Sequence, residues 1–269
     1  MVVSGQPKVG KTLAINGVWG NMGVAFGPLL AGLLSDQFGW RATFLLPGIV
    51  ILATGVVYAI AGRATVIDKT STDGSGGADW ALFRRLAILI GLITLLGGIV
   101  FHVTTVGLPK LFAERSGAES ALTQIGWMSA AVYAIAAFAQ IPVGLSLDRY
   151  SIKPVMLVVL AVQVPLLFAL AMAGPTVTVW IALVAMLFVF GEIPIQDAMV
   201  ARYVADQWRS RVYALKYVIS LGASAIAVPM MSGLLDATGS MTAVIYAIAA
   251  AAAVALLLAF ALPSESRTR

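Results

Sequence analysis

The chain has 269 residues, of which 60% are hydrophobic and only 11% charged, with a formal net charge of +5. Soluble globular domains are about 45–50% apolar and about 25% charged, so this composition excludes an ordinary soluble enzyme and a disordered chain. The sequence contains no cysteine, which excludes a disulfide framework, thiolate chemistry and a cysteine-ligated metal. We therefore expect a protein whose solvent is largely lipid.

Eight continuous apolar segments are each long enough to cross a bilayer, which takes about 20 helical residues. They cover residues 13–34, 42–62, 86–108, 124–147, 154–173, 177–199, 212–235 and 241–262. Only three charged residues fall inside them: Glu192, Asp197 and Lys216. Because the segments are continuous rather than alternating, the sequence predicts an all-α polytopic membrane protein with eight transmembrane helices, not a barrel.

The basic residues favour one orientation of these helices. If the first connecting loop lies outside, only Arg41, Lys110 and Arg115 of the 17 basic residues fall on the outer side. Cytoplasmic loops carry an excess of lysine and arginine, so we expect both termini to be cytoplasmic, in a bacterial inner membrane. Topology thus explains the net positive charge, and we expect no nucleic-acid partner.

One loop divides the chain. Residues 63–85 include a polar, Gly/Ser-rich stretch and form the longest connection between apolar segments. Such a composition is typical of a linker. We therefore predict a partial N-terminal half with two helices at residues 1–62, a cytoplasmic linker at 63–85 and a six-helix half at 86–269.

A weak internal repeat relates the first and seventh segments. Residues 27–39 and 228–239 share a proline, Pro28 or Pro229, followed by a glycine that precedes two leucines. Parallel repeats that lie six helices apart are typical of some transporters. The alternative is that proline, glycine and leucine are simply common in membrane helices.

Five small residues fall on one face of the first segment: Gly17, Gly20, Gly23, Gly27 and Ala31. Small residues let another helix backbone approach closely, so this stripe predicts tight helix packing on that face. Pro28 is expected to bend the helix where neighbours satisfy the freed carbonyl. The stripe could also serve generic packing without any role in transport.

Two motifs resemble those of the major facilitator superfamily. The pattern Ala14-x8-Gly23-x3-Gly27-Pro28-x2-Ala31-Gly32 resembles the motif of the fifth helix in antiporters of this family, with alanine at 14 and 31 where the motif has glycine. The pattern Gly144-x3-Asp148-Arg149-x-Ser151-x-Lys153 is similar to the family's cytoplasmic motif between helices eight and nine, with serine in place of a glycine. A carboxylate and cations at helix ends can form ion pairs and interact with helix dipoles.

The resemblance implies helices five to twelve of a twelve-helix fold, with the first four helices absent. We therefore expect a truncated reading frame, a misplaced start or a gene remnant. The intact form would be a secondary transporter of a small solute, with proton-coupled antiport as one version. The alternative is a non-transporting membrane remnant, or an assembly partner that packs through its Gly-rich helix.

Polar residues inside the segments are candidates for solute or proton contact, because charge in lipid is costly and usually faces a cavity or a partner. Glu192 and Asp197 lead the set, and a structural ion pair between Glu192 and Lys216 is the alternative. His102 could shuttle protons or pack through a hydrogen bond. Amides could line a path or hold helices together; these are Asn16, Asn21, Gln140 and Gln163.

Two further kinds of site are not expected. Residues Gly5–Thr12 match the P-loop pattern, but no strand precedes them and a membrane span follows, so we expect no nucleotide binding. A single histidine and the absence of paired aspartates leave no metal site, and no Gly-x-Ser-x-Gly elbow is present. We therefore expect neither a cofactor nor an enzymatic activity; the expected partners are the bilayer, a small solute and, as an option, protons.

Overall fold

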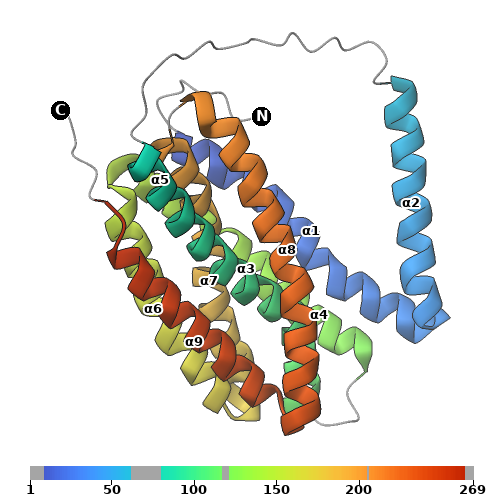
Figure 1. The fold of residues 1–269 in the computed structure, drawn as a ribbon. Helices are drawn as coiled ribbons and strands as arrows, with labels where there is room; N and C mark the ends of the chain where they lie inside the picture. Colours follow the sequence, from blue (N-terminus) through green and yellow to red (C-terminus); the bar gives the residue numbers. More distant parts are fainter. Residues whose placement is uncertain (1–8, 62–79, 117–120, 205, 264–269) are drawn as a thin grey trace.

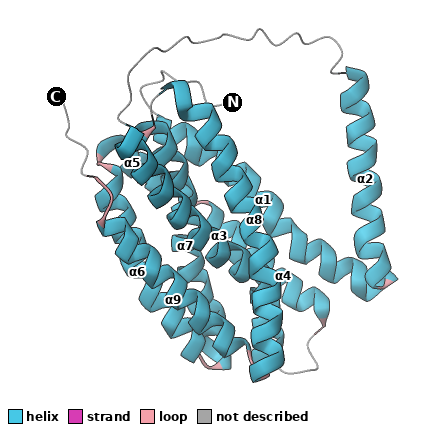
Figure 2. Ribbon diagram, viewed as in Figure 1, coloured by secondary structure: helices cyan, strands magenta, loops and turns pink. Residues whose placement is uncertain are grey.

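A computed structural model describes residues 9–61, 80–116, 121–204 and 206–263, and within these ranges the chain is helical without strands (Figure 2). The described residues contain eight spans that are long and apolar enough to cross a membrane, which confirms the predicted number. One of these spans, Leu122–Arg149, consists of two shorter helices. The helices in chain order are α1 (Val9–Phe38), α2 (Trp40–Ala61), α3 (Trp80–Ser116), α4 (Leu122–Ala137), α5 (Gln140–Arg149), α6 (Ile152–Met172), α7 (Pro175–Tyr203), α8 (Asp206–Thr238) and α9 (Met241–Phe260).

The fourth predicted segment is not one continuous helix. It breaks at Phe138 and Ala139, between α4 and α5, three residues before Pro142, which has no backbone N–H to donate. The side-chain amide of Gln140 donates to the Ala137 carbonyl at 3.2 Å. That bond satisfies a carbonyl at the end of α4, so the break is tolerated inside the membrane.

Several helices extend beyond the predicted segments. Helix α1 begins at Val9 and α8 at Asp206, each ahead of its apolar run. Helix α3 begins at Trp80, so the last residues of the predicted linker 63–85 are helical. Residues 62–79 lie outside the described residues, and the predicted division of the chain there stays a prediction.

The repeated segments end in the same way. Gly39, after α1, and Gly239, after α8, have φ values of +80° and +69°, which other residues rarely adopt. Each donates its N–H to the carbonyl four residues earlier, Gly39 to Ser35 at 3.0 Å and Gly239 to Leu235 at 2.7 Å. This pattern is a glycine C-cap, and it gives α1–α2 and α8–α9 the same tight turn.

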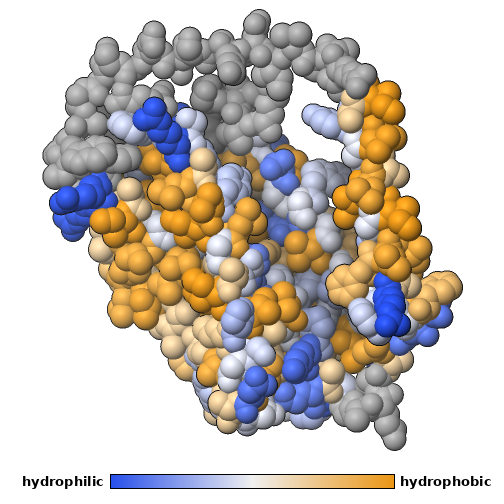
Figure 3. All heavy atoms as spheres, turned by 45° about the vertical axis from the view of Figure 1, so that its right-hand side comes forward, coloured by the Kyte–Doolittle hydropathy of each residue, from blue (hydrophilic) through white to orange (hydrophobic). Residues whose placement is uncertain are grey.

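The core lies in the bundle formed by α3–α9, with α6, α7 and α9 side by side in Figure 1. Its two apolar clusters centre on residues such as Phe190 and Leu160, and Leu13 and Ala25 of α1 join them. Helix α2 stands apart from the bundle and has no buried residue. In Figure 3, apolar side chains cover α2 and much of the visible body of the bundle.

Helix α1 packs on α4 and α5 through glycines, of which only Gly17 belongs to the predicted stripe. A Cβ added to Gly144 would lie 2.5 Å from the Ala14 Cβ and from the Gly10 carbonyl oxygen, so the helix backbones are in close contact there. Gly32 approaches the Leu122 carbonyl in the same way. These close contacts thus involve Gly10, Ala14 and Gly32 of α1.

The predicted stripe itself is mostly open. A Cβ added to Gly20, Gly23 or Gly27 would meet no atom within 4 Å, whereas at Gly17 it would collide with the amide of Gln140. The expectation of tight packing was therefore wrong for these three glycines among the described residues. They face the side of α1 that α4 and α5 do not cover.

Candidate functional site

A polar cavity of about 270 Å³ lies where α1 meets α3, α7 and α8. Its walls combine glycines, amides and the charged side chains of Glu192, Asp197 and Lys216 within apolar helices. Its lining residues are Asn16, Gly17, Gly20, Asn21, Gly97, Gly98, Phe101, Val189, Glu192, Ile193, Gln196, Asp197, Lys216, Tyr217 and Ser220. Polar groups concentrated at such a point mark a site for a ligand or an ion more often than a purely structural feature.

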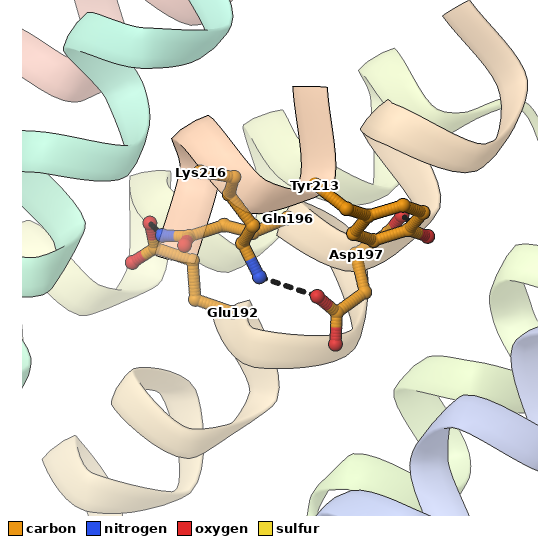
Figure 4. A network of polar contacts seen from close by, with 5 residues as sticks. All are labelled: Glu192, Gln196, Asp197, Tyr213 and Lys216. Atoms are coloured by element: carbon orange, nitrogen blue, oxygen red, sulfur yellow. Dashed lines mark hydrogen bonds and ion pairs between the residues drawn. The ribbon is translucent and has the colours of Figure 1, made fainter. Parts of the chain in front are cut away.

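Glu192 lies at the buried end of this cavity, on α7, with 3% of its surface exposed. Its carboxylate accepts a hydrogen bond from the Gln196 amide at 2.8 Å, one helical turn further on (Figure 4). A Cβ on Gly97 of α3 would lie 2.3 Å from both the Glu192 Oε1 and the Gln196 Nε2. Glycine at 97 therefore gives these two side chains the space that they occupy against α3.

The charged pair of the cavity joins α7 and α8. Lys216 donates to the Asp197 carboxylate, and the Tyr213 hydroxyl donates to the Asp197 backbone carbonyl at 2.8 Å. Lys216 thus pairs with Asp197 rather than with Glu192, contrary to the ion pair considered from the sequence. In Figure 4 the Glu192 carboxylate and the Lys216 ammonium point in different directions.

The other sequence candidates are divided between the cavity and its surroundings. Asn16 and Asn21 line the cavity from α1. His102 lies behind the lining, with its Nε2 at 3.1 Å from the Ser220 carbonyl oxygen, which favours the packing interpretation. Gln163 of α6 is fully buried outside the cavity, and its amide has no hydrogen-bond partner within the described residues.

The cytoplasmic-type motif, residues 144–153, contacts the first turn of α1 through Asp148. Asp148 accepts hydrogen bonds from the backbone N–H groups of Gly10 at 2.9 Å and Lys11 at 3.1 Å. A carboxylate at a helix N-terminus satisfies free amides and complements the helix dipole. The sequence suggested ion pairs and interactions with helix dipoles for this motif. Asp148 makes the second kind of interaction, with the N-terminus of α1.

The two cations of the motif do not pair with Asp148 in the described structure. Lys153 donates to the carbonyls of Phe260 and Leu262, both at 2.8 Å, and so caps the end of α9. Arg149 is exposed at the end of α5. The motif thus joins α5 to α1 through its carboxylate and α6 to α9 through its lysine.

The opposite end of α1 is held in a similar way. The Asp36 carboxylate accepts hydrogen bonds from the Thr123 backbone N–H at 2.8 Å and from its hydroxyl at 2.5 Å. Thr123 lies in the first turn of α4, so Asp36 caps that helix from outside. Helix α1 is therefore fastened at both ends by a carboxylate on the N-terminus of a helix.

Sequence reasoning assigned no role to Gln196, Gly97 or Thr123, and it cited Asp36 only as part of the repeat. Gln196 had a readable signal, because it lies four residues after Glu192 and so shares its helix face. Gly97 and Thr123 carried no such signal, since their roles depend on which helices meet. The P-loop-like stretch is described only from Val9 onwards, where Gly10 to Thr12 form the first turns of α1.

The fold and this cavity define an integral membrane protein built from apolar helices around a polar centre. The sequence matches the family model described as Major Facilitator Superfamily over residues 3–192 and 119–269. These matches cover nearly the whole chain, and the chain belongs to this superfamily, which is one of transporters rather than enzymes. A search of curated proteins found no match.

A solved structure has the same fold. The crystal structure of the E. coli fucose:proton symporter, FucP, aligns with a TM-score of 0.63 at 15% sequence identity. The alignment covers 85% of this chain and 58% of the symporter chain. The chain thus spans a little more than half the length of that structure, and at this identity the likeness shows the fold alone.

Proposed function

We propose that the chain contributes the binding cavity of a secondary transporter that moves a small solute with proton coupling. The polar cavity between α1 and the bundle of α3, α7 and α8 carries this proposal. Transporters of this kind bind at the bilayer midplane, between two groups of helices that rock against each other. In this chain α1 would move against α4 and α5. The hydrogen bonds of Asp148 and of Asp36, at the two ends of α1, would then break alternately.

Glu192 is the proton carrier in this proposal. It is buried, it accepts only a neutral amide hydrogen bond among the described residues, and it lines the cavity. An isolated carboxylate in a low-dielectric site is strongly disfavoured, so it binds a proton readily. Asp197 is less suited, because Lys216 already neutralises it. Antiport is the version that the fifth-helix motif of α1 supports.

The orientation belongs to the proposal as well. The positive-inside pattern puts the start of α1 and the end of α9 in the cytoplasm of a bacterial cell. The Asp148 cap would then close the inner side and the Asp36 cap the outer side. A fluorescent protein fused after Arg269 should fluoresce, and alkaline phosphatase at the same point should be inactive; the reverse result would contradict this orientation.

Further helices complete the transport unit in this proposal. The open face of Gly23 and Gly27 and the unburied α2 offer surfaces on which such helices would pack. They could precede this chain or belong to another chain. The same open face supports the second candidate, a membrane protein that acts only as an assembly partner.

Cysteine accessibility tests the proposal cleanly, because the natural chain has no cysteine. Ser220→Cys places a thiol in the cavity, and Val218→Cys, on the same helix but 67% exposed on its outer side, is the matched control. A membrane-impermeant maleimide should label position 220 from both sides of oriented vesicles and leave position 218 unlabelled. Labelling from one side only would favour the assembly partner, and no labelling would reject an aqueous cavity.

A further inference from the structure

The charges that line the cavity do not balance, and we propose that its solute is a small organic cation with an ammonium group. This inference rests on the proposed function, because it names the substrate class of the same site. Two carboxylates, Glu192 and Asp197, face the cavity, but only one ammonium, that of Lys216. Lys216 pairs with Asp197, so when Glu192 has released its proton its negative charge has no cationic partner among the described residues.

No wall of the cavity supplies the missing positive charge. Helix α1 contributes the neutral amides of Asn16 and Asn21, and α3 contributes two glycines and Phe101. Helix α8 contributes the phenol of Tyr217, and Gln163 of α6, outside the lining, is also a neutral amide. Within the described residues, Lys216 is therefore the single cation at the site, and its partner is already fixed.

A buried carboxylate of this kind needs a counter-charge or a proton. Gln196 donates one hydrogen bond to Glu192, which compensates part of the lost hydration but none of the charge. A solute ammonium could supply both the charge and further N–H donors. A neutral solute would leave the deprotonated carboxylate uncompensated, and an anionic solute would face it directly without a free cation.

The remaining walls suit an ammonium group as well. The side-chain carbonyls of Asn16 and Asn21 can accept its N–H bonds. The Lys216 ammonium lies 5.1 Å from the centre of the Tyr217 ring, so a cation already sits on this aromatic wall, and Phe101 adds a second ring. The volume of about 270 Å³ limits the solute to the size of a small metabolite.

Three compounds of one shape test the charge preference directly. They are 3,3-dimethylbutylammonium, 3,3-dimethylbutan-1-ol and 3,3-dimethylbutanoate, which carry a positive, zero and negative charge. Binding to the purified full chain in lipid nanodiscs is measured by calorimetry at one pH. The ammonium compound should bind about tenfold more tightly than the other two, the effect of one partly screened charge pair. Equal or tighter binding of the alcohol or the carboxylate, or no binding of all three, would overturn the proposal.

Two variants assign the preference to Glu192. Glu192→Gln removes the charge and keeps the shape, and the ammonium and the alcohol should then bind equally. Asp236→Asn makes the same charge change at an exposed position of α8 and should leave the preference intact. A preference that survives in Glu192→Gln would reject the assignment. If Ser220→Cys is labelled from both sides while the ammonium shows no preference, the cavity function stands and only the substrate class is wrong.

Discussion

Helices α2 and α6 are similar in length and apolar composition but differ in how much of their surface the rest of the protein buries. They have 22 and 21 residues, both are strongly apolar, and each has a proline in its interior, Pro47 in α2 and Pro165 in α6. Helix α6 packs between α7 and α9 and buries eight residues, whereas α2 buries none. Apolar composition therefore determines that a segment can cross a membrane, but it does not determine which protein surface the segment packs against.

The largest expected difference between the two regions comes from truncating a leucine in each. Leu160→Ala on α6 removes a fully buried side chain and should lower the free energy of unfolding by about 2–5 kcal/mol through lost packing and a cavity. Leu52→Ala on α2, where the side chain is 71% exposed, should change it by less than about 0.5 kcal/mol.

Unfolding in mixed SDS and dodecyl maltoside micelles measures both leucine variants under the same conditions. A comparable loss at both positions would show that α2 is packed in the protein under those conditions. A loss at neither position would contradict the core described around Leu160.

The next largest effect on stability is expected from substituting Gly144, which lies in the contact with α1, compared with Gly27, which lies outside it. Gly144→Leu would force the α5 backbone away from Ala14 and Gly10 and should cost about 1–3 kcal/mol. Gly27→Leu is the matched control, because a Cβ added at this position meets no atom within 4 Å. The apparent melting temperature of the purified protein should fall for the first variant only. A larger fall for Gly27→Leu would place a packed neighbour on the open face of α1.

The fold was largely predictable because the physical constraint is simple. Every backbone amide in lipid must be satisfied within its own helix, so long apolar segments such as 154–173 could be assigned without knowledge of their neighbours. Helix ends were less predictable, since α8 begins with the polar residues Asp206 and Gln207 ahead of its apolar run. The break before Gln140 was missed because Pro142 alone does not reveal whether a helix bends or ends.

The charged residues of the cavity could be selected from the sequence, but their pairing could not. Charge in lipid is so costly that Glu192, Asp197 and Lys216 stood out at once. Which carboxylate Lys216 contacts depends on the rotation of α8 against α7, and a single sequence does not contain that angle. The same limit explains the glycines of α1: the spacing predicted a contact on the face of Gly23, and the contact uses Ala14 and Gly32 instead.

A smaller effect is expected where the core meets the cavity. Gly97→Ala would place a methyl group against the Glu192 carboxylate and the Gln196 amide and should cost about 1–2 kcal/mol of stability. Gly91→Ala, one and a half turns earlier on α3, meets only the Ile219 methyl at 3.4 Å and should be nearly neutral. Unfolding in mixed micelles measures both. Equal stability of the two variants would mean that Glu192 and Gln196 do not occupy the positions described against α3.

The smallest effect concerns the caps that fasten α1 to the bundle. Asp36→Ala removes the acceptor for the backbone N–H and hydroxyl of Thr123 and should cost about 0.5–1 kcal/mol, because the site is exposed to solvent. Asp236→Ala is the matched control at the equivalent end of α8, where the aspartate is also exposed. Hydrogen exchange at the Thr123 amide should accelerate several-fold in the first variant and stay unchanged in the second. If the glycine contacts alone held α1, the Thr123 amide would exchange at the same rate in both variants. That result would contradict the proposal that the Asp36 and Asp148 hydrogen bonds break and re-form when α1 moves.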